Sequence, residues 1–114
     1  MAKNKLSKIR PAIKKYVVEL GKIGIRPLKV IVYGSYATGK VHAGSDIDLV
    51  VISKDLVKWP PIERLQILSR ATFNVDAPLE VIGYTPKEIA KNGDRSIFWE
   101  EVTHTGKEVF KKTA

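Results

Sequence analysis

The sequence of 114 residues contains no cysteine. This absence excludes a disulfide framework, a thiolate metal site and a cysteine nucleophile. Long apolar runs are also absent, because runs such as 30–33 and 49–52 fall far short of the ~20 residues that span a bilayer. The amino-terminal stretch has no apolar signal core. We therefore expect a cytoplasmic protein that makes no membrane contact.

Acidic residues are scarce in the first part of the chain. Residues 1–40 carry ten Lys or Arg and a single acid, Glu19, whereas residues 41–114 carry ten Lys or Arg and eleven acids. The whole chain has a formal charge of +8. The basic part is either an arm that attracts nucleic acid or another polyanion, or the solvated face of one helix.

The remaining composition is that of one globular domain covering residues 1–114, with 44% hydrophobic and 28% charged residues. Apolar residues spaced three or four apart predict a basic amphipathic helix within residues 1–24. The stripe consists of Leu6, Ile9, Ile13, Val17, Leu20 and Ile23. Ser7 is a candidate for its N-cap, and Gly21, Gly24 and Pro27 mark its end.

Residues 28–110 alternate between strand-like and helix-like segments. β-Branched and apolar runs predict strands at 28–33, 46–52, 78–84 and 107–110. Helices are predicted at 36–40, 62–72 and 96–103, and residues 85–88 are predicted to cap a short helix that has Pro86 at its first position. The order indicates an α/β (α+β) domain with a small mixed β-sheet flanked by helices, on which Phe98 and Trp99 are expected to pack.

Two carboxylates open the second predicted strand. Asp46 and Asp48 are two residues apart, so both side chains project from one face while Ile47 and Leu49 point into the core. Two unpaired like charges on one face repel each other. A divalent cation between them would remove the repulsion, and oxygen ligands favour Mg²⁺ or Mn²⁺ over Zn²⁺. The alternative is a pair of solvated carboxylates at a frayed strand end.

Gly34 and Ser35 stand directly between a predicted strand and a predicted helix. Glycine allows the backbone to approach a phosphate closely, and a helix N-terminus offers free N–H groups. A Gly-Ser turn alone is common. Followed by the Asp46 and Asp48 pair on the next strand, it places an anion-binding turn beside a candidate metal site.

Four segments carry a resemblance to a known family: 34–39, 44–49, 80–86 and 106–110. They read Gly-Ser-Tyr-Ala-Thr-Gly, Gly-Ser-Asp-Ile-Asp-Leu, Glu-Val-Ile-Gly-Tyr-Thr-Pro and Gly-Lys-Glu-Val-Phe. In this combination and spacing they resemble the nucleotidyltransferase superfamily, whose catalytic fold is that of DNA polymerase beta. The resemblance is strongest to the minimal nucleotidyltransferase branch, whose members pair with HEPN-domain proteins in toxin–antitoxin systems.

The resemblance implies a nucleotidyltransferase fold and a two-metal reaction. Asp46 and Asp48 would hold two Mg²⁺ ions, with Mn²⁺ as an alternative, and Glu80 would complete the metal site. Glu80 would also deprotonate or orient the attacking hydroxyl, which displaces pyrophosphate from a nucleoside triphosphate such as ATP. Asp76 is the rival third acid, but it lies four residues from Glu80, which is ~13 Å along an extended strand.

The resemblance also implies that Gly34, Ser35, Lys40 and Ser45 bind the nucleotide. From the residues alone, the favoured role of the Ser45 hydroxyl is to cap or tighten the turn before the two aspartates. Many relatives have arginine directly after Gly-Ser, and this chain has Tyr36 there. Lys40 could replace the missing cation, or it could be a solvated lysine.

Three functions follow from these residues. The first is an enzyme that transfers AMP to a hydroxyl, with the acceptor surface supplied by a HEPN-type helical partner or by self-association into a homo-oligomer. The second, which Tyr36 favours, is an antitoxin that neutralises its partner by contact alone. The third is a basic nucleic-acid-binding module, which ranks last because the sequence contains no aromatic-rich RNA motif.

Overall fold

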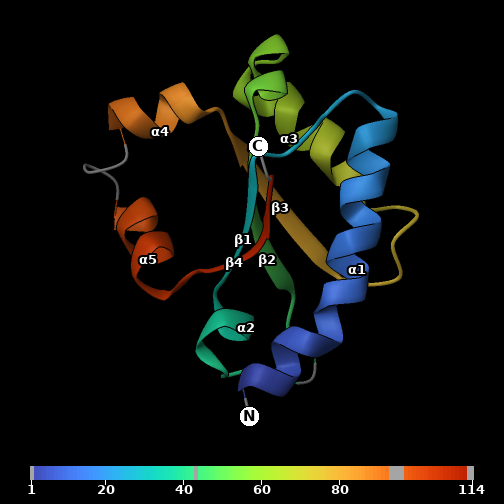
Figure 1. Cartoon of the computed structure of the whole chain (residues 1–114), viewed down its shortest axis with the longest axis vertical. Coiled ribbons are helices and arrows are strands. Elements are labelled where there is room, and N and C mark those ends of the chain that lie inside the picture. The colour runs from blue at the N-terminus through green and yellow to red at the C-terminus, as the bar shows by residue number, and fades with distance from the viewer. Residues whose placement is uncertain (1, 43, 93–96, 113–114) are drawn as a thin grey trace.

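The computed structural model of the chain describes residues 2–42, 44–92 and 97–112 (Figure 1). In chain order the elements are α1 (Ala2–Lys22), β1 (Lys29–Tyr33), α2 (Ser35–Thr38), β2 (Ile47–Ile52), the 3₁₀ helix η1 (Lys54–Lys58), α3 (Pro61–Arg70), β3 (Leu79–Tyr84), α4 (Pro86–Asn92), α5 (Ile97–Thr105) and β4 (Lys107–Lys111). Ser96, which the sequence placed in the last helix, lies outside the described residues.

The four strands form one mixed sheet in the order β3-β2-β1-β4. β1 pairs antiparallel with both β2 and β4, and β2 pairs parallel with β3. Parallel neighbours need a long crossover connection, and η1 and α3 lie in it. The predicted α/β class with a small mixed sheet is therefore confirmed.

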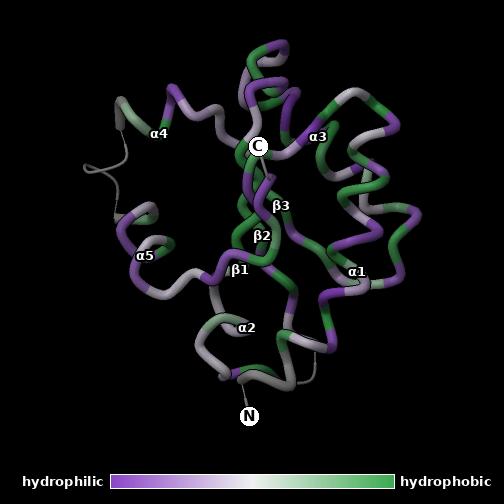
Figure 2. The backbone as a smooth tube through the Cα atoms, viewed as in Figure 1, coloured by the Kyte–Doolittle hydropathy of each residue, from purple (hydrophilic) through white to green (hydrophobic). Residues whose placement is uncertain are grey.

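Helices cover both faces of the sheet, with α1 and α3 on one side and α4 and α5 on the other (Figure 1). Side chains alternate between the two faces along each strand. On β2, Leu49 and Val51 belong to the larger core under α1 and α3, whereas Val50 and Ile52 join a smaller cluster with Val102 of α5. Figure 2 shows the resulting concentration of hydrophobic residues along the central strands.

Helix α1 begins ahead of its predicted N-cap residue. Because it begins at Ala2, Ser7 lies inside the helix, and the prediction that Ser7 caps it is wrong. Four of the five helical residues ahead of Ser7 are good helix formers (Ala2, Lys3, Lys5 and Leu6), and they extend the helix by more than a turn. The buried face also differs, since Tyr16 is fully buried whereas Ile23 is 46% exposed. Within the described residues, no helix combines the length and apolarity that a membrane span requires.

Two aromatic pairs fix α5 against its face of the sheet. Phe98 contacts Tyr33 edge to face, with 5.2 Å between ring centroids. Trp99 contacts Tyr84 in the same manner, with 5.8 Å between ring centroids. Such offset geometries are favourable for aromatic rings. The expectation that Phe98 and Trp99 pack on the sheet is confirmed.

A buried hydrogen bond joins α1 to α3. The hydroxyl of Tyr16 donates to the backbone oxygen of Leu68 over 2.8 Å. Leu68 lies in the last turn of α3, where carbonyl groups have no partner within the helix. Burial raises the pKa of Tyr16, so the phenol stays protonated and remains a donor.

Replacing Tyr16 tests this bond directly. We expect Tyr16→Phe to lower the free energy of unfolding by ~1–2 kcal/mol, because the Leu68 oxygen is left buried and unsatisfied. Tyr36→Phe on α2 is the matched control and should change stability by less than ~0.5 kcal/mol. Urea denaturation measures both. Equal stabilities of the two variants would contradict a stabilising hydrogen bond from Tyr16 to Leu68.

Candidate active site

The strand register brings two of the predicted acids side by side. Asp48 of β2 is the register partner of Glu80 on β3, and it also faces Tyr33 across the antiparallel pair with β1. All three residues project from the face that α5 covers farther along the strands. Asp46 stands one residue ahead of β2 and is exposed.

Asp48 is partly buried and lies beside other acids, and both conditions disfavour its charged form. Burial raises the pKa of Asp48 to about 6, with smaller contributions from the charges of Glu80 and Asp46 and from a hydrogen bond to Glu80. Burial also raises the pKa of Tyr33 to about 12, and the charges of Asp48 and Glu80 contribute to this shift. The carboxylates therefore act on one another and on the phenol.

Gly34 brings the turn after β1 against Asp48. Its backbone has φ 71° and ψ −147°, a combination that a side chain makes costly. A Cβ atom at this position would lie 2.5 Å from Oδ2 of Asp48. The amides of Ala37 and Thr38 both donate to the Gly34 oxygen, so α2 begins at Ser35. Glycine is required here by both conformation and space.

The other predicted nucleotide-binding residues differ in their surroundings. Ser35 is half-buried at the start of α2, and Lys40 is exposed just after it. Ser45 is buried, and its hydroxyl accepts a hydrogen bond from the His42 amide over 2.9 Å. The Ser45 amide donates in return to the His42 oxygen over 3.0 Å. The Ser45 side chain therefore tightens the turn that leads to Asp46.

The two rival third acids lie in different places. Glu80 is opposite Asp48 within the sheet, whereas Asp76 is exposed in the segment that precedes β3. The parallel register, which the sequence alone does not specify, makes this difference. Glu80 is thus the acid that the fold places beside Asp48.

A divalent cation fits the chemistry of this donor set. Among residues 2–42, 44–92 and 97–112, no three acidic or histidine side chains are gathered closely enough to hold a metal ion, so Asp46, Asp48 and Glu80 do not form such a group. Mg²⁺ usually takes only one or two carboxylates and completes its shell with water and substrate phosphates. Burial, together with the neighbouring acids, disfavours the charged form of Asp48, and a bound cation would stabilise that form. Asp48 with Glu80 or Asp46 therefore suits a cation shared with a nucleotide.

Sequence reasoning missed two parts of this region. Tyr33 was not singled out, although it ends β1 immediately before Gly34 and shares the face of Asp48. Arg64 was read only as part of a helix, but it is buried and its guanidinium donates to the Gly83 oxygen and to both carboxylate oxygens of Glu88. Arg64 thereby links α3 to the end of β3 and the start of α4. These partners lie 19 and 24 residues away in the chain, so no local sequence pattern indicates this role.

Acids on adjacent strands of a mixed sheet, beside a glycine turn at a short helix, form a candidate site for phosphoryl transfer. The sequence matches the family described as nucleotidyltransferase domain over residues 10–103. The chain therefore belongs to the nucleotidyltransferase domain family and is a nucleotidyltransferase by class. No curated protein matches this sequence.

Solved structures share the fold. A protein of Sulfolobus solfataricus, provisionally assigned as a nucleotidyltransferase, is 19% identical, with a TM-score of 0.66 over 97% of this chain and 87% of that one. A toxin–antitoxin complex with AMP-PNP is 20% identical, with a TM-score of 0.55 over 88% of this chain and 73% of that chain. A mutant of the toxin–antitoxin pair MntA-HpeT is 18% identical, with a TM-score of 0.54 over 88% of this chain and 73% of that chain. At these identities the likeness establishes the fold alone.

Gly34 offers a test of the turn geometry with a matched control. Gly24 also has positive φ (+84°), but a Cβ there meets nothing within 4 Å. We expect Gly34→Ala to destabilise the protein by ~1–3 kcal/mol and by at least ~1 kcal/mol more than Gly24→Ala, because only the former displaces a carboxylate. Urea denaturation measures the difference. Equal losses would contradict the close approach to Asp48.

The crowded carboxylates predict a pH dependence of stability. The pKa of Asp48 is about 6 in the folded protein and ~4 in an unfolded chain. The folded state therefore binds the proton more tightly, and the free energy of unfolding falls as the pH rises from ~4 through about 6. We expect Asp48→Asn to stabilise the metal-free protein at pH 8 by on the order of 1 kcal/mol, after allowing for solvent screening of a partly exposed group.

The measurement is urea denaturation in the presence of a chelator, carried out at pH ~4 and at pH 8. The gain from Asp48→Asn should shrink toward the acidic end, where the wild-type carboxyl is already neutral. Asp76→Asn, which removes an exposed carboxylate outside the strand, is the control and should show no comparable gain. A less stable Asp48→Asn protein at pH 8 would contradict the raised pKa of Asp48.

Proposed function

We propose that this protein transfers AMP from ATP to a hydroxyl group on a HEPN-type helical partner. The observation that carries the proposal is the placement of Asp48 opposite Glu80, with Asp46 and the Gly34 turn beside them. Family membership supports the reaction class. Two of the neighbouring structures are toxin–antitoxin complexes, one of them with AMP-PNP, which supports an adenine nucleotide and a protein partner.

The proposed reaction is an in-line displacement at phosphorus. The acceptor oxygen forms a bond to the α-phosphorus of ATP, the bond from that phosphorus to the bridging oxygen breaks, and pyrophosphate leaves. Asp46, Asp48 and Glu80 would hold two Mg²⁺ or Mn²⁺ ions. When bound, such ions offset the charge that develops on the attacking and leaving oxygens.

The chain's own groups have distinct parts in this proposal. Glu80 orients the acceptor hydroxyl and takes up its proton, because it is exposed and faces Asp48 from the neighbouring strand. The turn at Gly34 and Ser35 lies against the triphosphate, where the first amides of α2 have no partner within the helix. Lys40, exposed after α2, adds a positive charge, and Ser45 holds the turn before Asp46.

A second candidate is an antitoxin that acts by contact alone. The observation that favours it is Tyr36, which packs partly buried against the larger core and brings no cation to the turn. Without that charge, nucleotide affinity depends on Lys40 and on bound metal. The two candidate functions differ in whether the carboxylates of Asp46 and Asp48 are needed to neutralise the partner.

Label transfer separates them. The protein is incubated with Mg²⁺, ATP labelled at the α-phosphate, and a co-expressed HEPN-type partner. We expect label on the partner, reduced at least ~100-fold by Asp46→Asn combined with Asp48→Asn, because removing a group that acts only in the transition state costs that order of rate. Asp76→Asn is the control that should retain transfer.

The same variants decide the contact-only candidate. Its prediction is that the double Asn variant still neutralises the partner's toxicity in cells. Loss of neutralisation by a variant that still forms the complex supports transfer. Label transfer that survives the double substitution, or that fails equally in Asp76→Asn, would overturn the proposed reaction.

A further inference from the structure

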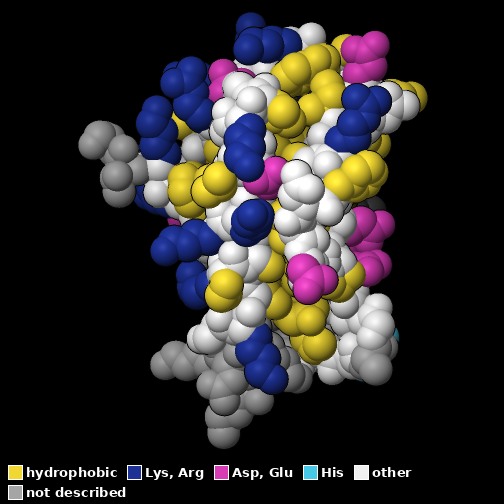
Figure 3. Space-filling model, turned by 90° about the vertical axis from the view of Figure 1, so that its right-hand side faces the viewer, with side chains coloured by type: hydrophobic (Ala, Val, Ile, Leu, Met, Phe, Trp, Pro, Cys, Tyr) yellow, Lys and Arg dark blue, Asp and Glu magenta, His cyan; other side chains and the backbone are white. Residues whose placement is uncertain are grey.

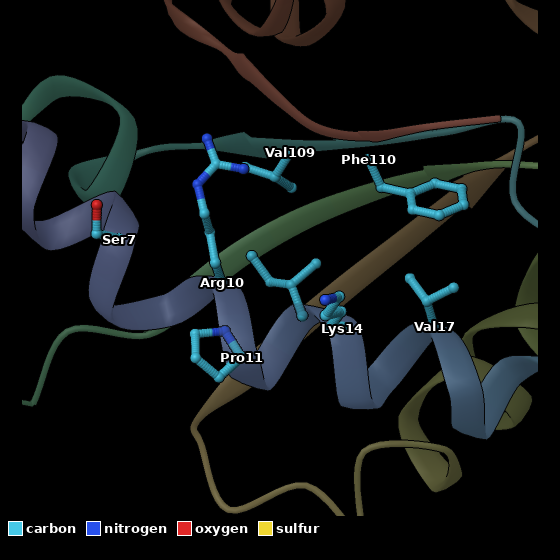
Figure 4. A pocket seen from close by; sticks show the side chains of 8 residues that line it. Ser7, Arg10, Pro11, Lys14, Val17, Val109 and Phe110 are labelled. Carbon is cyan, nitrogen blue, oxygen red and sulfur yellow. The ribbon is translucent and has the colours of Figure 1, made fainter. Parts of the chain in front are cut away.

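A groove runs between α1 and the edge strand β4, and we call it the α1–β4 groove (Figure 4). Its volume is about 550 Å³. It is lined by Arg10, Pro11, Lys14 and Val17 of α1 and by Val109 and Phe110 of β4. The floor is mainly apolar, and the two cationic side chains belong to α1.

A β-bulge makes the apolar floor. The register of β4 against β1 passes from Val30 opposite Phe110 to Ile31 opposite Glu108, so Val109 is an extra residue. In a regular strand Val109 and Phe110 would face opposite sides of the sheet. The bulge turns both toward α1, and both line the same groove (Figure 4).

Within residues 2–42, 44–92 and 97–112, no ion pair engages the cations of the groove. Arg10 and Lys14 are both exposed and lie one helical turn apart. The ion pairs found among the described residues are Lys22 with Glu19, Lys29 with Glu108, and Arg64 with Glu88. None of them involves Arg10 or Lys14. Basic side chains run down this side of the molecule in Figure 3.

The groove lies on the opposite face of the sheet from the carboxylates. Ile13, Val109 and Phe110 pack with the larger core under α1, whereas the face of Asp48 carries the smaller cluster under α5. An occupant of the groove would therefore leave the candidate active site open. A function here is independent of nucleotidyl transfer.

We propose that the α1–β4 groove receives an acidic amphipathic helix of a partner protein. Apolar side chains of that helix would cover Val109 and Phe110, and carboxylates one turn apart would pair with Arg10 and Lys14. A helix suits the groove because Ser7, Arg10, Lys14 and Val17 form a continuous row along α1, against which a second helix packs side by side.

Other occupants fit less well. An added strand is disfavoured because the bulge and the exposed Lys107 and Lys111 protect the edge of β4. A second copy of the chain is disfavoured by its formal charge of +8, which repels a copy of itself. Nucleic acid is disfavoured because an apolar floor offers nothing to a phosphate backbone.

The experiment uses the full chain and a fluorescein-labelled peptide of ~20 residues, about 30 Å as a helix, with leucine on one face and glutamate pairs flanking it. Fluorescence anisotropy is recorded without ATP or metal. We expect a Kd on the order of 10 μM. Arg10→Glu combined with Lys14→Glu should weaken binding at least ~10-fold, because each pair becomes a repulsion.

Lys54→Glu combined with Lys58→Glu is the matched control, since both residues are exposed, four apart and outside the groove. It makes the same change in net charge and should alter the Kd less than ~2-fold. A peptide with serine in place of leucine should bind at least ~10-fold more weakly, because it cannot cover the apolar floor.

Three outcomes would overturn the proposal. They are equal weakening by the two charge-reversal pairs, tighter binding of an oligouridylate that Arg10→Glu with Lys14→Glu abolishes, and a dimer of the chain in sedimentation that this pair dissolves. Asp46→Asn combined with Asp48→Asn should leave peptide binding unchanged. A failure of the proposed transfer reaction would therefore not change this result.

Discussion

The register of β2 within the sheet is the constraint on which the rest of the structure depends. β2 buries Ile47, Leu49 and Val51 on one face and Val50 and Ile52 on the other. A slip of one residue would turn Asp48 into the larger core and an apolar neighbour out of it. Because that exchange is costly, Asp48 stays on the face of α5. The same register sets Glu80 and Tyr33 on either side of it.

This register also places two carboxylates, those of Asp48 and Glu80, side by side at the end of the sheet. The pKa of Asp48 is raised because burial and the neighbouring acids disfavour its charge. Gly34 adds to the crowding, since its turn fits only without a side chain. Local instability of this kind is typical of sites whose ligand is a cation or a phosphate bound to one. The stable parts, such as the bond from Tyr16 to Leu68, lie on the other face.

The two faces of the sheet carry different candidate sites. One face carries the carboxylates and is covered farther along by α4 and α5 (Figure 1). The other holds the larger core, α1 and the α1–β4 groove. Because strand side chains alternate, residues adjacent in sequence serve different faces. The basic residues of the first part of the chain thus lie mainly along α1, on the side away from Asp48.

The sequence by itself determined the fold class, the strands and the residues of the motif. Strong period-two and period-three-to-four patterns and a Gly-Ser turn followed by Asp46 and Asp48 are local signals, and local signals can be read from neighbours in the chain. Only the tertiary structure decided that Glu80 lies beside Asp48, that Arg64 braces β3, and that a bulge turns Val109 and Phe110 into one groove. These depend on which strands pair and in which register. Pairing is settled by the packing of distant residues, which no single stretch of sequence contains.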